Sequence, residues 1–179
     1  MKTFKNRHNQ CIKQDGKEYW ISRSVAVIGT ILLVKPSTDN NYDVYVLLSK
    51  RGEGTPDYKG YWNLICGYLD WDESGIQAVK REVWEESGLD LDEIINCYNI
   101  IDNRLNNPFR IDTEPSSNRQ NVSLSYGLAF KSYDFPTFDL SHMEPNEVSD
   151  VKWVNIKDID QYQIAFGHEK IIKIYNDLI

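Results

Sequence analysis

The chain is poor in cysteine and in long apolar runs. Its three cysteines, Cys11, Cys66 and Cys97, are odd in number and have no Cys-x-x-Cys spacing, which argues against a disulfide framework or a zinc ribbon. The first residues, MKTFKNRHNQC, are basic but contain no apolar signal-peptide core. No segment approaches the roughly 20 apolar residues that a membrane-spanning helix needs. We therefore expect a cytoplasmic protein that does not bind a membrane.

Positive charge is also in deficit, since 20 Lys and Arg residues face 27 Asp and Glu residues, for a net charge of -7. This balance argues against broad nucleic-acid binding through a basic surface, although a local basic pocket is compatible with it. Hydrophobic content of 41% with 26% charged residues is ordinary for a globular protein. The length of 179 residues fits one domain over 1–179, with a polar N-terminal extension at 1–22.

Strand-like segments dominate the order of elements. Residues 22–35 and 42–52 are rich in β-branched side chains and are joined by turn residues at 36–41, which predicts a hairpin. A polar stretch at 103–120 is longer than an ordinary connection and is typical of a functional lid or of disorder. Further strands are predicted at 61–67, 94–102, 121–132 and 148–155.

Two helices are predicted among these strands. In 74–87, Ser74 and Gln77 have the spacing of a capping box, the apolar side chains share one face, and Gly88 follows as a C-cap. Residues 167–179 form a second amphipathic segment at the end of the chain. Many strands with one central and one terminal helix predict an α+β fold around a mixed β-sheet.

The central helix carries three carboxylates where they are unfavourable. Glu82, Glu85 and Glu86 lie at i, i+3 and i+4, so they share one helical face near a C-terminus that favours cations. One interpretation is an ordinary solvated acidic face. The other is a binding site for a hard divalent cation, because Mg²⁺ takes carboxylate oxygens and bridges to substrate phosphates. The neighbouring Lys80 and Arg81 supply too little positive charge to neutralise the cluster.

The spacing around these carboxylates is specific. Gly67 is followed after five residues by Glu73, and after seven more by REVWEESGL at 81–89. The segment 67–89 resembles the Nudix box at every defined position. It departs from many relatives just before the box, where Ile65-Cys66 replaces Pro-Gly.

The resemblance implies a Nudix-like α/β/α sandwich and hydrolysis of a nucleoside diphosphate linked to another moiety, with Mg²⁺ or Mn²⁺ as cofactor. It also implies metal ligation by Glu82, Glu85, Glu86 and the Gly67 carbonyl oxygen. Arg81 would hold a box glutamate in position through a charge-assisted hydrogen bond. The implied partner is a small-molecule nucleotide, and a homodimer is a weak expectation carried over from relatives.

The residue that acts as general base could come from the box or from a loop outside it. Glu82 is one candidate, but metal coordination lowers the basicity of a carboxylate. In relatives of the ADP-ribose type the base often comes from a loop outside the box, and the segment MEPNEVSD contains Glu144 and Glu147. We predict Glu147 as the base because it lies nearer the following strand. The alternative is that both are ordinary acidic loop residues.

Two outlying segments resemble the ADP-ribose pyrophosphatase-like branch of the family. One contains Asn107-Pro108, Arg110 and Val122-Ser123; the other is Ala165-Phe166-Gly167-His168, with glycine where aspartate is usual. They favour ADP-ribose or a related nucleotide sugar as substrate. The predicted substrate-binding residues are Arg104, Arg110 and Arg119 in the polar stretch and, more weakly, Trp62.

Other functions are compatible with the same fold. A hydrolase that removes oxidised nucleotides such as oxidised dGTP is the main alternative. A non-catalytic nucleotide sensor or an isopentenyl diphosphate isomerase commonly has an incomplete box, whereas this box is complete. The sequence therefore favours an enzyme that hydrolyses a phosphoric anhydride.

Overall fold

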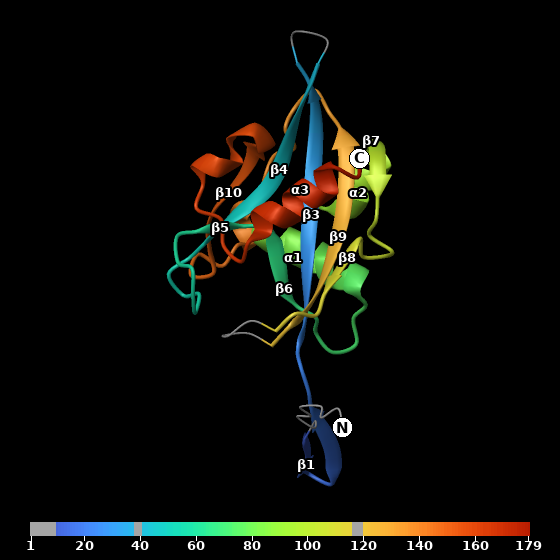
Figure 1. Ribbon diagram of the computed structural model, residues 1–179, viewed down its shortest axis with the longest axis vertical. Helices are drawn as coiled ribbons and strands as arrows, with labels where there is room; N and C mark the ends of the chain where they lie inside the picture. Colours follow the sequence, from blue (N-terminus) through green and yellow to red (C-terminus); the bar gives the residue numbers. More distant parts are fainter. Residues whose placement is uncertain (1–9, 38–40, 116–119) are drawn as a thin grey trace, which may run out of the picture.

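The protein is built on a mixed β-sheet. The computed structural model describes residues 10–37, 41–115 and 120–179. The central strand β3 (Val25–Pro36) pairs antiparallel with β4 (Tyr42–Arg51) and parallel with β9 (Val122–Lys131). With β10 (Val148–Asn155) and β7 (Asn99–Asn103) at the edges, the order is β10-β4-β3-β9-β7 (Figure 1). The predicted mixed sheet and its hairpin are confirmed.

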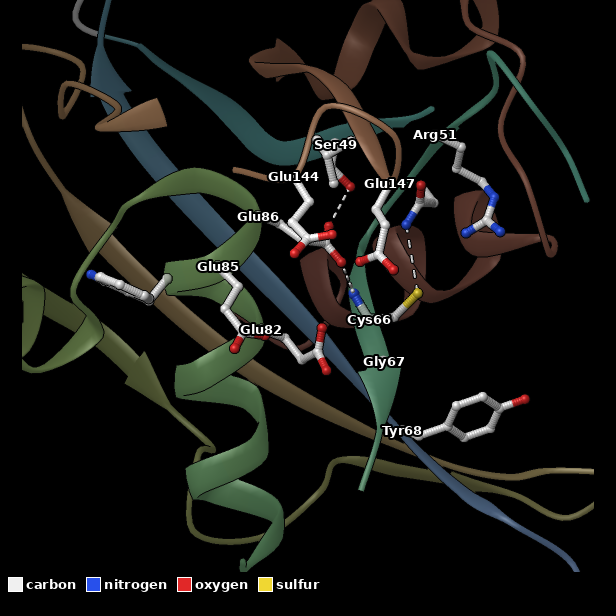
Figure 2. A pocket seen from close by; sticks show the side chains of 13 residues that line it. Ser49, Arg51, Cys66, Gly67, Tyr68, Glu82, Glu85, Glu86, Glu144 and Glu147 are labelled. Atoms are coloured by element: carbon white, nitrogen blue, oxygen red, sulfur yellow. Dashed lines mark hydrogen bonds between the residues drawn. The ribbon is translucent and has the colours of Figure 1, made fainter. Parts of the chain in front are cut away.

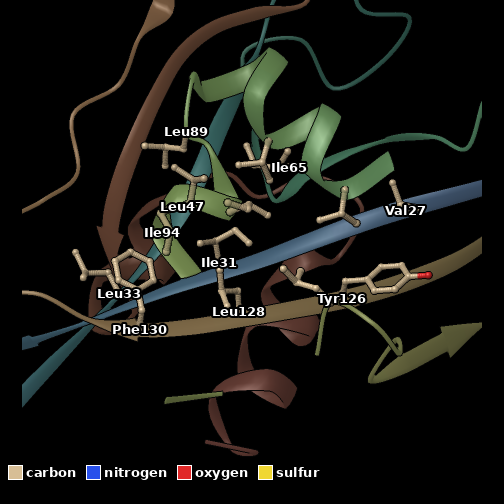
Figure 3. Close-up of a cluster of buried hydrophobic side chains, with 14 of the residues drawn as sticks. Val27, Ile31, Leu33, Leu47, Ile65, Leu89, Ile94, Tyr126, Leu128 and Phe130 are labelled. Carbon is tan, nitrogen blue, oxygen red and sulfur yellow. The ribbon is translucent and has the colours of Figure 1, made fainter. Parts of the chain in front are cut away.

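Helices cover both faces of this sheet. Helix α1 (Gly75–Ser87) lies on one face and α3 (His168–Asn176) crosses the other (Figure 1). Because both faces are covered, β3 is buried almost continuously, as is expected of a strand inside a sandwich. Its Ile31 belongs to the core under α1 (Figure 3). The next residue, Leu32, belongs to the core under α3.

Helix α1 begins and ends where the sequence predicts. Ser74 and Gln77 form the capping box, and Gly88 adopts the left-handed conformation with φ 69°. Val79 and Val83 are buried in the core beneath the helix. Their burial fixes the rotation of α1 about its axis, so the direction of its acidic face is also fixed.

The predicted strand at 94–102 is wrong in its first half. Residues Leu91–Cys97 form helix α2, and β7 begins at Asn99. Asp90 caps the helix by accepting hydrogen bonds from the backbone N–H groups of residues 92 and 93. Leu91 and Ile94 are both buried. Their i, i+3 spacing buries one helical face, and this outweighs the β-branched residues that suggested a strand.

Three short strands extend the sheet. Strands β5 (Trp62–Asn63) and β6 (Ile65–Tyr68) replace the single strand predicted at 61–67. They separate at Leu64, whose backbone N–H donates to the His168 side chain instead of to another strand. Strand β8 (Arg110–Asp112) pairs with β9, so the stretch predicted as a polar loop contains sheet structure.

The polar N-terminal extension contains a hairpin that the sequence did not indicate. Strands β1 (Gln10–Gln14) and β2 (Lys17–Ile21) pair antiparallel through a turn at Asp15 and Gly16, both with positive φ. The hairpin projects from one end of the sheet (Figure 1). Within the described residues, no helix has the length and apolar character needed to cross a membrane.

Candidate active site

Five carboxylates line a cavity of about 590 Å³, here called the first cavity. Glu82, Glu85 and Glu86 come from α1, and Glu144 and Glu147 come from the loop before β10 (Figure 2). The structure thus brings both loop glutamates to the three box glutamates. Among the described residues that line this cavity, Arg51 is the cationic one. The negative charge is therefore in clear excess.

Two glycines allow the loop with Glu144 and Glu147 to lie against the end of β4. The Gly52 N–H donates to the Glu147 carbonyl oxygen at 2.7 Å, and the Gly54 N–H donates to the Asn146 carbonyl oxygen at 2.7 Å. A Cβ atom on either glycine would overlap Asn146. Close backbone approach therefore positions the two loop carboxylates at the cavity.

Glu86 occupies a partly buried position in the cavity wall. The Ser49 hydroxyl donates to its carboxylate at 2.6 Å, and the Cys66 backbone N–H donates at 3.4 Å. Burial raises the pKa of Glu86 to about 8, and the Ser49 hydrogen bond opposes this rise while the charge of Glu82 adds to it. A bound cation would favour the charged form of this carboxylate.

Arg81 organises the other box carboxylates. Its Nη1 donates to Glu82 at 2.6 Å and to Glu85 at 3.0 Å. Its Nε and Nη2 donate to the two oxygens of Glu73 at 3.1 and 2.8 Å. Arg81 therefore donates hydrogen bonds to three acidic side chains at once, and its positioning role stays a prediction. These contacts place Glu73 beside Arg81 and outside the lining of the first cavity, which favours a structural role for Glu73.

Gly67 is sterically tied to Glu82. It lies in β6 opposite Val27 of β3, and a Cβ atom at this position would overlap the Glu82 carboxylate. Burial raises the pKa of Glu82, and its hydrogen bond from Arg81 lowers it. The Glu82 carboxylate therefore lies directly against the β6 backbone, and a side chain at position 67 would displace it.

The donor set fits a hard divalent cation in its chemistry. Carboxylate and backbone oxygens surround one cavity, and oxygen ligands are those that Mg²⁺ and Mn²⁺ prefer. In the part of the chain that the structure describes, no three Asp, Glu, His or Cys side chains converge as a finished metal site. Ser49 donates a hydrogen bond to Glu86, and Arg81 donates to Glu82 and Glu85.

Comparison with known proteins assigns the family. A model of the NUDIX domain matches residues 27–175, which is most of the chain. The chain belongs to the Nudix family. Family membership and the complete box identify it as a Nudix hydrolase, an enzyme that cleaves phosphoric anhydrides. Nudix hydrolases use divalent metals. No curated protein matches the sequence.

Solved structures resemble this Nudix domain at low sequence identity. The NUDIX domain of Shewanella oneidensis NrtR, complexed with ADP ribose, has a TM-score of 0.63 at 20% identity, over 88% of this chain and 89% of that one. A bifunctional NMN adenylyltransferase/ADP ribose pyrophosphatase from Francisella tularensis, complexed with AMP and a Mn ion, has a TM-score of 0.61 at 22% identity. That match covers 88% of this chain and 42% of the other. These likenesses support the α/β/α sandwich fold.

A second cavity of about 560 Å³ adjoins the first. The two cavities share Arg51, Cys66, Gly67 and Tyr68 in their linings. Aromatic and neutral polar side chains contribute to the second cavity, among them Tyr58, Phe166, Ser125 and His168. The sequence pointed to Tyr58, as an aromatic residue near the box entrance, and to the segment of Phe166 and His168. It gave no signal for Ser125 or for Arg51.

The predicted substrate-binding residues are not brought together. Trp62 is 7% exposed, belongs to the core under α3 and packs edge-on against Tyr162. It lines neither cavity, so the prediction that it stacks on substrate is corrected: its place in β5 beneath α3 makes it a core residue.

The three predicted arginines also differ from one another. Arg104 pairs with Asp102 and lines neither cavity. Arg110 is held by Asp112, which does line the second cavity. Arg119 lies outside the described residues. Arg51, at the end of β4, is the arginine that the fold places between the two cavities.

Proposed function

We propose that this Nudix hydrolase cleaves a nucleoside diphosphate linked to another moiety, with ADP-ribose or a related nucleotide sugar as the preferred substrate. The observation that carries the proposal is the pairing of the two cavities. The acidic first cavity suits a metal-bound diphosphate, and the adjoining aromatic cavity offers room for an organic group. The ligands named for the Shewanella and Francisella structures support this substrate class.

The proposed roles follow from where the side chains lie. Glu82, Glu85 and Glu86, with the Gly67 carbonyl oxygen, would hold Mg²⁺ or Mn²⁺. When bound, such a cation supplies charge neutralisation and lowers the pKa of a bound water. Arg51 would meet the diphosphate, because it lines both cavities and Asp57 holds its guanidinium in place at 3.0 Å.

Glu147 is the proposed general base. Its carboxylate lines the first cavity, and the backbone hydrogen bond from Gly52 fixes the loop that carries it. A carboxylate outside the metal-binding set keeps its basicity, so it can take a proton from the attacking water. Glu144 lines the same cavity and is the alternative within the loop.

Arg81 has a positioning role in this scheme. It contacts Glu82 and Glu85 but does not line the first cavity itself. It therefore acts on the reaction through the carboxylates that it holds. The other cationic residue of α1, Lys80, pairs with Asp92 instead, so Arg81 is the one that holds the box carboxylates.

The test is a substrate panel assayed with Mg²⁺, with Mn²⁺ and with a chelator. We expect kcat/KM for ADP-ribose to exceed that for oxidised dGTP, and both activities to disappear with the chelator. A value for oxidised dGTP about tenfold above that for ADP-ribose would favour the sanitising alternative. Tight nucleotide binding without turnover of any compound would favour the non-catalytic sensor.

A further inference from the structure

His168 lines the second cavity and carries a hydrogen-bond donor on a ring that is held in place. The side chain is 3% exposed and lines the cavity from the start of α3. Its Nδ1 accepts the Leu64 backbone N–H at 3.1 Å. Burial lowers the pKa of His168 to about 3, with the nearby charge of Arg51 adding to the effect, so the ring is neutral. A neutral ring that accepts at Nδ1 carries its proton on Nε2.

Ser125 contributes a second polar group to the same wall. It lies in β9, is 1% exposed and lines the second cavity. Its Oγ has no hydrogen-bond partner among the described residues. An unpaired buried hydroxyl is unfavourable, so a ligand atom that accepted its hydrogen bond would remove that cost.

Aromatic side chains in unusual backbone conformations form another part of the wall. Tyr58 and Phe166 both have positive φ, 50° and 61°, and both line the second cavity. Their rings are in edge contact with centroids 4.7 Å apart, and the Arg51 guanidinium lies over Phe166 at 4.9 Å. Non-glycine residues with positive φ have a strained backbone, and such residues cluster at ligand sites.

We propose that the second cavity binds the nucleobase, and that His168 and Ser125 are specificity-determining residues that donate hydrogen bonds to acceptor atoms of the base. The aromatic wall suits a planar ring. The carboxylates of Asp112 and Glu114, which also line the cavity, disfavour a phosphate there. This inference rests on the proposed function because it takes the diphosphate to lie at Arg51, between the cavities.

The experiment measures binding instead of turnover. The full chain is titrated calorimetrically with AMP, which carries a base, and with ribose 5-phosphate, which lacks one. For His168→Asn, we expect AMP affinity to fall about five- to tenfold, as for the loss of one hydrogen bond, while ribose 5-phosphate affinity stays unchanged. The Asn side chain can still accept the Leu64 N–H, so the melting temperature should stay close to that of the parent.

His168→Gln is the matched variant, because its amide reaches the position of Nε2 but not that of Nδ1. It should retain most of the AMP affinity while lowering the melting temperature through loss of the Leu64 contact. Ser125→Ala should weaken AMP binding about fivefold while leaving stability equal or slightly higher, since its hydroxyl is unpaired. A structural role alone would move stability and binding together.

Each remaining outcome decides the proposal. Equal weakening of AMP and ribose 5-phosphate would overturn it and assign the second cavity to the sugar end. Unchanged AMP affinity in both His168→Asn and Ser125→Ala would also overturn it, as would a parent that binds neither ligand. A parent that hydrolyses nothing in the panel, yet binds AMP with the expected dependence, would refute the proposed activity and leave the base site supported.

Discussion

The two cavities lie side by side but differ in how they are built. The first is dominated by five carboxylates, three of them within five residues of one helix. The second combines aromatic rings and neutral donors with fewer carboxylates, and its lining comes from segments far apart in the sequence, such as those of Tyr58 and His168. The proposed metal-assisted reaction would use the concentrated charge of the first cavity, and the proposed base site would use the shape and hydrogen-bond donors of the second.

The largest expected effect is a loss of turnover when carboxylates of the first cavity are replaced. Glu85→Gln and Glu86→Gln should each lower kcat by about a hundredfold or more, because each removes a carboxylate proposed to hold metal. Steady-state assays at saturating Mg²⁺ measure this. Glu93→Gln, the same charge change at an exposed site in α2, is the control. Near-normal turnover in both box variants would show that the first cavity is not the metal site.

The next effect distinguishes the carboxylates within the first cavity. Glu147→Gln should lower kcat by about a hundredfold, the lower end of what general-base catalysis contributes, while Mg²⁺ affinity holds. Glu144→Gln should have a much smaller effect. Metal titration beside the kinetics separates the two roles, with Glu82→Gln as the reference for a metal ligand. If both loop variants stay within about threefold of the parent, Glu82 becomes the candidate base.

A substitution at Gly67, which lines both cavities, tests whether the position of Glu82 matters for the reaction. Gly67→Ala should lower kcat by about tenfold or more, because the added methyl group overlaps Glu82 and must displace it. Gly60→Ala is the matched control for a change of glycine: it has open space at its Cβ, although its positive φ should lower stability slightly. Unchanged kinetics in Gly67→Ala would mean that the position of Glu82 does not matter for the reaction.

The smallest effect is on stability and depends on pH. Because the pKa of Glu86 is raised to about 8 from an ordinary 4.5, the folded protein holds this proton more tightly than the unfolded chain. Below pH 4.5 the two states are alike, and stability is lost as pH rises toward 8. Without metal, Glu86→Gln should therefore gain melting temperature relative to the parent at pH 8 but not at pH 4.5. Added Mg²⁺ should reduce the gain by stabilising the parent, and a gain equal at both pH values would contradict the assignment.

The first cavity was largely predictable because its determinants are local. Glu82, Glu85 and Glu86 follow helical spacing, and the capping box at Ser74 and the C-cap at Gly88 fix where that helix starts and stops. The loop carboxylate Glu147 was predicted through the family resemblance. The structure shows that Glu147 lines the same cavity as the box glutamates. Its position depends on hydrogen bonds between the loop and the residues that follow β4.

Mistaken predictions came from features that local sequence does not distinguish. Residues 94–97, Ile-Ile-Asn-Cys, begin with two β-branched residues that suit a strand, but the Asp90 cap and the burial of Leu91 and Ile94 make them part of a helix. Trp62 has the alternation of a strand residue, which says that one side is buried but not what covers it. The packing of α3 over the sheet decided that question.

The sequence by itself determined the family, the acidic helix and the excess of negative charge that a cation would offset, because each is encoded by spacing along a short segment. The tertiary structure decided the second cavity. Arg51, Ser125 and His168 are up to 117 residues apart, and pairing of strands with the docking of α3 brings them to one wall. No periodicity in the sequence predicts that these residues come together. The burial of Ser125 and the tautomer of His168 depend on neighbours that only the folded chain supplies.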